Sequence, residues 1–394
     1  MAGPSLSAAE RRARLGVRHR LAVSARVDDD PAAIARSVLV LHASDPATVV
    51  LSVLARMREP DPSVVEAALY DDRALVRMLA MRRTLFTVAT VDLALVHAAG
   101  SRAVAATERQ RFLKMVEDAG ISTAPGRWVR AREREALAAL TELHEATAAE
   151  ISAAAPKLAI RIPVNQGTRY EGSIGVGTRV LLLLAADGRI VRGRPSGAWT
   201  SSLHRWSTVE HWLGGPIEAR SVEESRRELA RRWLARFGPA TIADLKWWTG
   251  WTLGHTRAAV AGLETEVVDL DGAEGLVLAG DAEPTPEPEP WVALLPSLDP
   301  TSMGWQARGW YLGPHKAQVF DSNGNAGATV WADGRIVGGW AQRKSGEIAV
   351  RLLEDLGKEQ RSAVDDAAAQ LEAALGEIRV TPRFPAPLDK ALAR

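Results

Sequence analysis

Two side chains that can take part in catalysis lie two residues apart in the string Leu41-His-Ala-Ser-Asp-Pro46. The imidazole of His42 can accept or orient a proton near neutral pH, and the hydroxyl of Ser44 can hold a water molecule. The carboxylate of Asp45 could act as a base or stabilise a nearby positive charge. We therefore take His42, Ser44 and Asp45 as candidate catalytic residues.

Each candidate also has a structural interpretation. Asp45 followed by Pro46 is typical of the N-cap and first residue of a helix, and this cap is the simpler explanation of Asp45. His42 could end the preceding helix, and Ser44 could be an ordinary capping residue. The start of a helix nevertheless favours anions such as DNA phosphate, because its backbone N–H groups and dipole are positive.

Helical patterns surround these residues, and a strand pair follows them. Apolar spacing predicts helices near 7–21, 32–43, 46–58 and 62–70, and alternation predicts strands near 75–81 and 84–89. Arg82 and Arg83 fall at the turn between the two strands. Because helices followed by a hairpin are the order of a winged helix, we expect a winged-helix unit over residues 1–125.

Two further blocks repeat this order loosely, and we interpret them as winged-helix units over 126–215 and 216–280. The second block is predicted to hold a helix over 133–155, a flexible loop over 163–177 and two strands around an Asp187-Gly188 turn over 180–191. The third block is predicted to hold helices at 224–237, 240–248 and 253–263 and a strand pair at 266–279.

Residues 281–290 alternate proline with acidic residues, which predicts an extended linker. Beyond it, strands are predicted at 291–295, 317–320, 328–332 and 335–340, with a helix near 359–376. This composition suggests a small antiparallel β-barrel closed by a helix over 291–394. The tryptophans of this region could stack on bases, but filling the core is their more frequent role. They are Trp305, Trp310, Trp331 and Trp340.

The net charge of +1 hides local clusters of arginine. Residues 1–27 carry six arginines against one acid, and residues 189–206 carry four arginines and no acid. Such clusters suit phosphate binding, although arginine-rich solvated surfaces are equally common. The candidate DNA-binding residues are Arg18, Arg20, Arg82, Arg83, Arg169, Arg192 and Arg194.

The composition excludes several classes of site. The absence of cysteine rules out disulfides, thiolate zinc sites and iron–sulfur clusters, and no His-Glu-x-x-His pattern is present. We therefore expect no metal and no cofactor. The apolar runs are too short for a membrane span and the first residues lack a secretory pattern, so we expect a cytoplasmic, nucleoid-associated protein with no membrane partner.

Several strings, taken together, resemble the AlkZ-like (YcaQ-like) family of bacterial DNA glycosylases over most of the chain. The strings are 41–46, 81–85, 237–248, 294–300 and 331–340. The resemblance implies an α+β fold, in which tandem winged-helix units form a concave DNA-binding scaffold with a C-terminal antiparallel β-barrel. It further implies a monomeric enzyme that acts on damaged DNA, duplex or single-stranded, in base excision repair.

The sequence departs from this family at its catalytic motif. The family has Gln-x-Gln or Gln-x-Asp with an apolar middle residue, whereas this chain has His42-Ala43-Ser44. The resemblance thus places the two catalytic positions at His42 and Ser44.

The function expected from the resemblance is hydrolysis of the N-glycosidic bond of an alkylated or deaminated purine, hypoxanthine among them. Such hydrolysis passes through an oxocarbenium-like sugar, so a neutral His42 would position or activate the attacking water. Since Lys114 is the nearest lysine in sequence, a monofunctional enzyme is favoured over a Schiff-base mechanism. The alternatives are a non-catalytic winged-helix DNA-binding protein or transcriptional regulator, and a protein that binds lesions to recruit repair factors.

Overall fold

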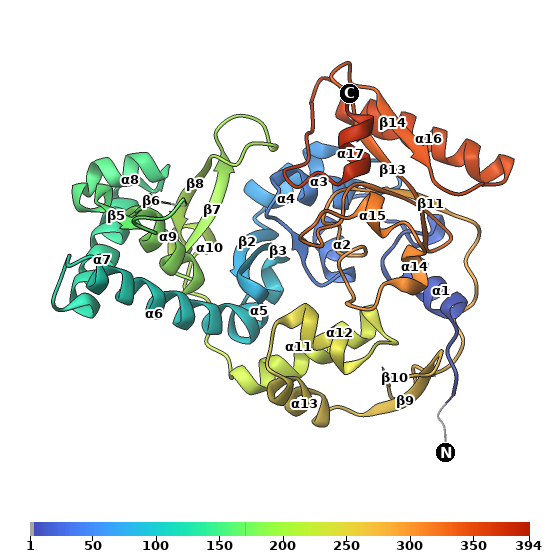
Figure 1. Cartoon of the computed structure of the whole chain (residues 1–394), viewed down its shortest axis with the longest axis horizontal. Helices are drawn as coiled ribbons and strands as arrows, with labels where there is room; N and C mark the ends of the chain where they lie inside the picture. Colours follow the sequence, from blue (N-terminus) through green and yellow to red (C-terminus); the bar gives the residue numbers. More distant parts are fainter. Residues whose placement is uncertain (1–3, 170) are drawn as a thin grey trace.

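The computed structural model describes residues 4–169 and 171–394 and has a mixed α+β fold with small antiparallel sheets (Figure 1). The chain begins with α1 (Ala8–Arg18), which Ser7 caps by accepting the N–H of Glu10. Short 3₁₀ or π-helical turns lie at Val23–Ala25, Met81–Arg83, Thr90–Asp92, His97–Ser101 and Pro156–Ala159.

A short strand, which sequence did not predict, contains His42 and precedes Ser44 and Asp45. Helix α2 (Pro31–Ser37) ends early because the chain turns at Leu39, whose φ of 64° is left-handed. Strand β1 (Leu41–His42) follows, and α3 (Pro46–Leu54) starts after its N-cap, Asp45. The prediction of one helix over 32–43 was therefore wrong at its C-terminal end.

The first segment also forms the predicted hairpin. Helix α4 (Pro62–Tyr70) leads into β2 (Leu75–Ala80) and β3 (Thr84–Ala89), and the sheet order is β1-β3-β2. This pairing fixes His42 opposite Phe86 on β3, which in turn lies opposite Met78 on β2. The helices and hairpin are confirmed, whereas their assignment to a winged helix stays a prediction.

A helical stretch then leads away from the sheet to the second segment. It comprises α5 (Leu93–Val96), the π-helical turn and α6 (Arg102–Asp118). The second segment contains α7 (Pro125–Leu143), β4 (Glu145–Ala146), α8 (Ala148–Ala154), β5 (Arg161–Val164), β6 (Gly172–Gly175), α9 (Val176–Ala186), β7 (Ile190–Pro195), β8 (His204–Thr208) and α10 (Val209–Leu213).

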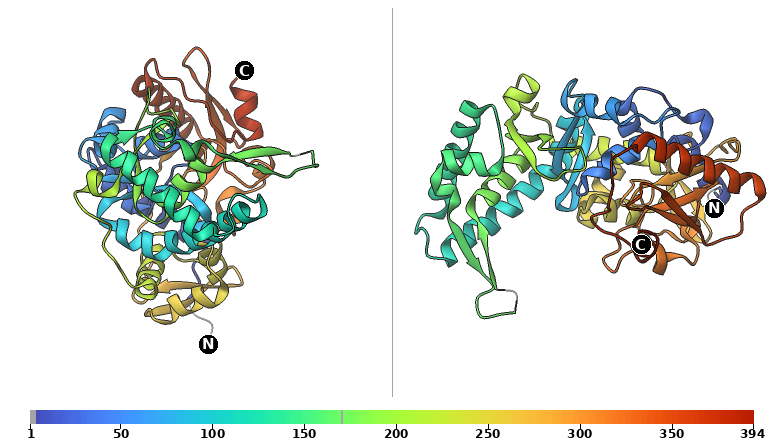
Figure 2. Two further views of the ribbon diagram at one scale, coloured as in Figure 1. Left: turned by 90° about the vertical axis from the view of Figure 1, so that its left-hand side faces the viewer. Right: turned by 90° about the horizontal axis from the view of Figure 1, so that it is seen from above.

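Three predictions for this segment need correction. The helix over 133–155 is broken at His144, because Thr147 and Glu150 form a capping box that starts α8. The strand predicted from residue 180 is instead α9, whose apolar residues bury a helical face, and Asp187 is its C-cap rather than a hairpin residue. The loop over 163–177 is largely the β5–β6 ribbon, which projects away from the body of the segment (Figure 2).

The third segment agrees with its predicted order. It contains α11 (Val222–Phe237), α12 (Ile242–Thr249), α13 (Leu253–Ala261), β9 (Thr265–Leu270) and β10 (Ala273–Leu278). The linker that follows is extended but fastened to the body, since the guanidinium of Arg14 donates to the carbonyls of Asp281 and Glu283.

The C-terminal segment is an open sheet rather than the predicted barrel. Its elements are β11 (Val292–Leu295), α14 (Gly309–Leu312), α15 (Lys316–Val319), β12 (Thr329–Ala332), β13 (Arg335–Gln342), β14 (Ile348–Leu352), α16 (Lys358–Leu375) and α17 (Pro387–Leu392). The strand order is β11-β12-β13-β14, and within the described residues the edge strands β11 and β14 do not pair. The sheet does not close into a barrel, because residues 316–319 form α15 where a further strand was predicted at 317–320.

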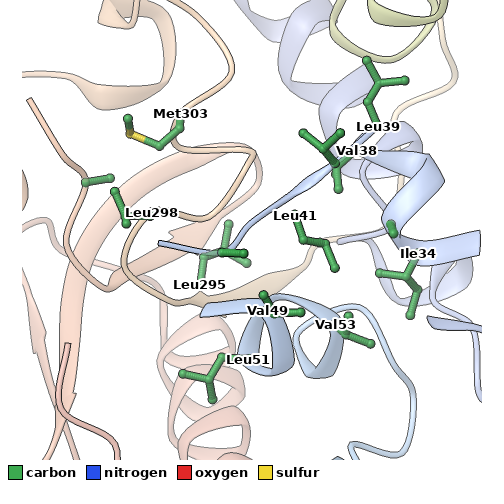
Figure 3. Packing of buried hydrophobic residues seen from close by; sticks show 14 of the residues in the cluster. Ile34, Val38, Leu39, Leu41, Val49, Leu51, Val53, Leu295, Leu298 and Met303 are labelled. Carbon is green, nitrogen blue, oxygen red and sulfur yellow. The ribbon is translucent and has the colours of Figure 1, made fainter. Parts of the chain in front are cut away.

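One hydrophobic core joins the first, third and C-terminal segments. Leu41 and Val49 lie beside Leu295 in this core (Figure 3). The second segment has a core of its own, built mainly from α6 to α9, but its Val191, Trp199, Val209 and Trp212 belong to the first core. The predicted domain boundaries stay a prediction, but the shared core means that the chain around His42 is supported by the distant C-terminus.

Candidate active site

His42 is buried at the edge strand of the first sheet. It is 9% exposed, and its ring meets Phe86 edge-on with ring centroids 5.6 Å apart. Burial, with a smaller contribution from the charge of Arg82, lowers the pKa of His42 to about 3. His42 is therefore neutral over the physiological pH range.

The Nδ1 atom of His42 faces its own loop. The backbone N–H of Ser44 points at Nδ1 from 3.4 Å, a long hydrogen bond that favours the tautomer with the proton on Nε2. In that tautomer Nε2–H can donate a hydrogen bond, and neither ring nitrogen is free to remove a proton. Ser44 itself is only partly buried.

Asp45 has both carboxylate oxygens occupied by backbone donors. Oδ1 accepts the N–H of Ala47 at 3.1 Å, and Oδ2 accepts the N–H of Arg383 at 2.8 Å. Burial raises the pKa of Asp45, and these two donors partly offset that effect. The geometry accounts for Asp45 as a helix cap that also holds the C-terminal segment.

Arg82 lies at the tip of the β2–β3 hairpin in a left-handed conformation with φ of 54°. Its guanidinium lies 4.4 Å from the ring of Trp247 on α12, and Arg308 also contacts that ring. Gly250 permits this contact, since a Cβ there would come within 2.8 Å of the Arg82 side chain. Burial and the charge of Arg308 lower the pKa of Arg82 to about 10, so it remains a cation beside His42.

Comparison with known proteins decides the family. A family model described as DNA glycosylase AlkZ-like matches residues 35–374. The chain belongs to the AlkZ-like DNA glycosylase family. It is accordingly a DNA N-glycosylase, and its substrate is DNA.

A solved member supports the fold of this AlkZ-like glycosylase. Streptomyces sahachiroi DNA glycosylase AlkZ superposes with a TM-score of 0.73 at 21% sequence identity, covering 96% of this chain and 99% of that chain. A search of curated proteins found no match. Within residues 4–169 and 171–394, no helix is both long and apolar enough to cross a membrane.

The candidate DNA-binding arginines of the glycosylase fall into separate groups. Arg83 forms an ion pair with Glu108, and Arg18 forms one with Asp281. Arg194 pairs with both Glu66 and Asp71. Arg20 has a left-handed φ of 56° and contributes, with Arg18, to the positive surroundings of Arg236. Arg169 is exposed on the loop joining β5 to β6.

Arg192 lies in a different environment, on β7 above the ring of Trp206 at 5.0 Å. Burial, followed by the charges of Arg77 and Arg383, lowers the pKa of Arg192 to about 10. Arg383 belongs to the candidate site as well, because its guanidinium reaches the carbonyl of Ser44 at 3.5 Å. The structure therefore brings Arg192 and the His42 loop into one positively charged neighbourhood.

Sequence analysis missed Arg77, Arg383 and Trp247. Arg77 interrupts an apolar strand, a signal that could have been noticed as a buried charge. Arg383 lies in the C-terminal segment and reaches the His42 loop only through tertiary packing. The tryptophans of the C-terminal segment are buried in the core, except Trp310, which is partly buried beneath Arg11.

Proposed function

We propose that this glycosylase hydrolyses the N-glycosidic bond of an alkylated or deaminated purine, with His42 positioning the attacking water. The observation that carries this proposal is the neutral, buried imidazole of His42, which lies where the sequence resemblance places the first residue of the family's catalytic motif. A cationic imidazole would oppose the positive charge that develops on the sugar, whereas a neutral one does not.

The geometry favours orientation of water over proton abstraction. An imidazole with a pKa of about 3 is a weak base at neutral pH, and its Nδ1 already accepts from Ser44. In an oxocarbenium-like transition state the attacking water needs little activation, because the leaving base has largely departed. The hydroxyl of Ser44 lies on the same loop as His42, and we assign it a hydrogen bond to the attacking water.

Positive groups around the loop would hold the DNA backbone. Arg82 acts on His42, Arg192 is influenced by the charge of Arg383, which contacts the His42 loop, and the other candidate arginines would extend the contact along the strand. The projecting β5–β6 ribbon would probe the duplex, since its small residues tolerate close approach to DNA. A single chain with these surfaces would bind around the DNA as a monomer.

The test is base release from oligonucleotides that carry one lesion. Duplex and single-stranded DNA with hypoxanthine, 7-methylguanine or a 3-methyladenine analogue would be incubated with wild type, His42→Ala, Ser44→Ala and the control His211→Ala. His211 is exposed and stacks on His144, so it controls for loss of a histidine elsewhere.

The proposal expects wild type and His211→Ala to release at least one lesion, and His42→Ala to lose about a hundredfold in single-turnover rate while keeping DNA affinity. If no lesion is released although DNA binding is intact and salt-sensitive, the chain is a non-catalytic DNA-binding member of its family.

A further inference from the structure

Arg77 on β2 is a buried cation without a carboxylate partner. It is 2% exposed, and its Nη1 donates to the hydroxyl of Tyr70 at 2.7 Å. Its Nε and Nη2 find no hydrogen-bond partner among the described residues. Since a buried guanidinium with unsatisfied N–H groups is costly, this arrangement calls for an explanation.

Arg56 shows what a satisfied buried arginine looks like in the same chain. It is fully buried, forms two hydrogen bonds with Asp299 and donates further to the carbonyls of His19 and Ser52. Arg77 has none of these acceptors. The contrast shows that the fold can neutralise a buried guanidinium when that group is purely structural.

Two groups on which the charge of Arg77 acts are positive or neutral. Arg192 is cationic and is also influenced by the charge of Arg383, and His204 is kept neutral by burial, with the charges of Arg77 and Arg192 adding to that effect. Thr87 lies opposite Arg77 in the strand register, and its buried hydroxyl also has no partner among the described residues. Arg77 and Arg192, which both line the same cavity, therefore offer donors to an anion.

A cavity of about 160 Å³ lies at this place, between β2 and the α9–β7–β8 part of the second segment. Arg77, Arg192, Thr178 and Trp206 are among its lining residues. It has room for more than one water molecule, and its polar groups lie among aliphatic side chains such as Leu79, Leu181 and Ile190.

We propose that this cavity, which we call the Arg77 pocket, binds a phosphate group, and that its source is a phosphodiester of the bound DNA strand. Arg383 connects the pocket to the candidate active site, because it holds Asp45 and Ser44 and its charge also acts on Arg192. A phosphodiester held there would fix the strand beside His42. The DNA source rests on the proposed function, whereas phosphate binding itself does not.

The first experiment measures phosphate binding without DNA. Inorganic phosphate is titrated into wild type, Arg77→Met, Arg192→Gln and Arg189→Gln in phosphate-free buffer, and the melting temperature and heat of binding are recorded. Arg77→Met removes the charge and keeps an apolar stem of similar length, and Arg192→Gln changes a partly exposed residue that the fold tolerates more readily. Arg189→Gln removes the same charge from the same segment, where it only pairs with Glu210 at the surface.

Saturating phosphate should raise the melting temperature of wild type and Arg189→Gln by about 2–4 °C and leave that of Arg77→Met and Arg192→Gln unchanged. Arg77→Met should be at least as stable as wild type without phosphate, because it removes an uncompensated buried charge. Equal phosphate binding by all four proteins would contradict the proposal that phosphate binds in the Arg77 pocket.

The second experiment identifies the source of the phosphate. DNA duplexes that carry one neutral methylphosphonate at successive positions around a lesion are tested for binding, not for base release. At one position the neutral linkage should weaken binding to wild type about tenfold and leave binding to Arg192→Gln unchanged. If no position shows this coupling while free phosphate still binds through Arg77, the pocket takes a soluble phosphate and the DNA assignment is wrong. Because neither experiment measures catalysis, both remain decisive if base release is absent.

Discussion

His42 illustrates how burial selects one of the roles open to an imidazole. In water the ring would titrate near pH 6.5 and could serve as a general base, whereas in this loop its pKa falls to about 3. The N–H of Ser44 also occupies Nδ1. Both effects leave a neutral ring that donates from Nε2, which suits the orientation of a water against an oxocarbenium-like sugar.

The pH dependence of base release follows from this state. Because His42 is neutral down to about pH 3, the single-turnover rate should stay flat between pH 8 and pH 5. An enzyme whose histidine titrates normally would lose activity as the pH falls through about 6.5. Rates measured across this range on one lesion would distinguish the two, and a decline centred near pH 6.5 would contradict the neutral-ring account.

An isosteric change of Asp45 tests whether its carboxylate serves the fold or the chemistry. Asp45→Asn keeps an oxygen for the helix cap but loses the carboxylate oxygen that accepts the backbone N–H of Arg383. We therefore expect the free energy of unfolding to fall by about 1–2 kcal/mol. The base-release rate should stay within about fivefold of wild type, since both oxygens already serve the fold. Urea unfolding and single-turnover kinetics measure the two effects. A loss of rate as large as that of His42→Ala would make Asp45 part of the chemistry.

Residue types and spacing were sufficient to select His42, Ser44 and Asp45 as candidates, because the three lie in one short string. They could not select Arg383, and for Arg77 they offered only the signal of a charge within an apolar strand. The importance of those two residues arises from neighbours distant in sequence, which no local pattern encodes.

At the scale of elements, local patterns predicted what was locally determined. The Asp45-Pro46 pair marked a true helix start, because a cap is formed within one turn. The apolar run over 180–186 was misinterpreted as a strand, since a short run fits either structure until its packing is known. Its leucines pack on α6 and α7, and that tertiary contact decides for the helix.

The ion pair between Arg56 and Asp299 links the end of α3 to the C-terminal segment. Both side chains are fully buried, and although burial opposes ionisation of Asp299, Arg56 holds the pKa of its carboxyl below the usual value. Removing one partner by Asp299→Ala should cost about 3–5 kcal/mol, because the other charge is left buried and unpaired.

The replacement of both partners, Arg56→Met with Asp299→Leu, should recover much of this loss. Chemical denaturation of the single and double variants measures it. A single variant as stable as wild type would show that the link does not hold α3 in place.

At the scale of the whole molecule, the loop that holds His42 is supported by segments far apart in the chain. The C-terminal residues pack with the first segment and fasten Asp45, while the second segment brings Arg192. The family resemblance implied the mixed α+β fold, but the open sheet and the shared core depend on contacts between distant segments. For that reason the prediction of a barrel was wrong.

Three histidines from different segments make the whole fold sensitive to acid. Burial lowers the pKa of His19, His42 and His204 to about 3, whereas the unfolded chain binds protons near pH 6.5. Their contribution is fully present above pH 6.5 and is lost as the pH falls, by about 1.4 kcal/mol per pH unit for each histidine. Asp389 acts in the opposite direction, since burial raises its pKa to about 6, but it offsets only one of the three.

The free energy of unfolding should therefore fall steeply between pH 6 and pH 4.5, and His204→Gln should make this slope shallower by about 1.4 kcal/mol per pH unit. Unfolding followed at several pH values measures the slope, with His211→Gln as the exposed control. An unchanged slope in His204→Gln would mean that this histidine is protonated in the folded chain.

The most direct test of the central claim is the single-turnover rate of base release by His42→Gln beside His42→Ala. If His42 occupies the catalytic position of the AlkZ-like motif, glutamine should restore the rate to within about tenfold of wild type, while alanine stays about a hundredfold lower. Equal rates for wild type and His42→Ala, or a glutamine variant as inactive as alanine, would contradict the assignment of this position to the chemistry.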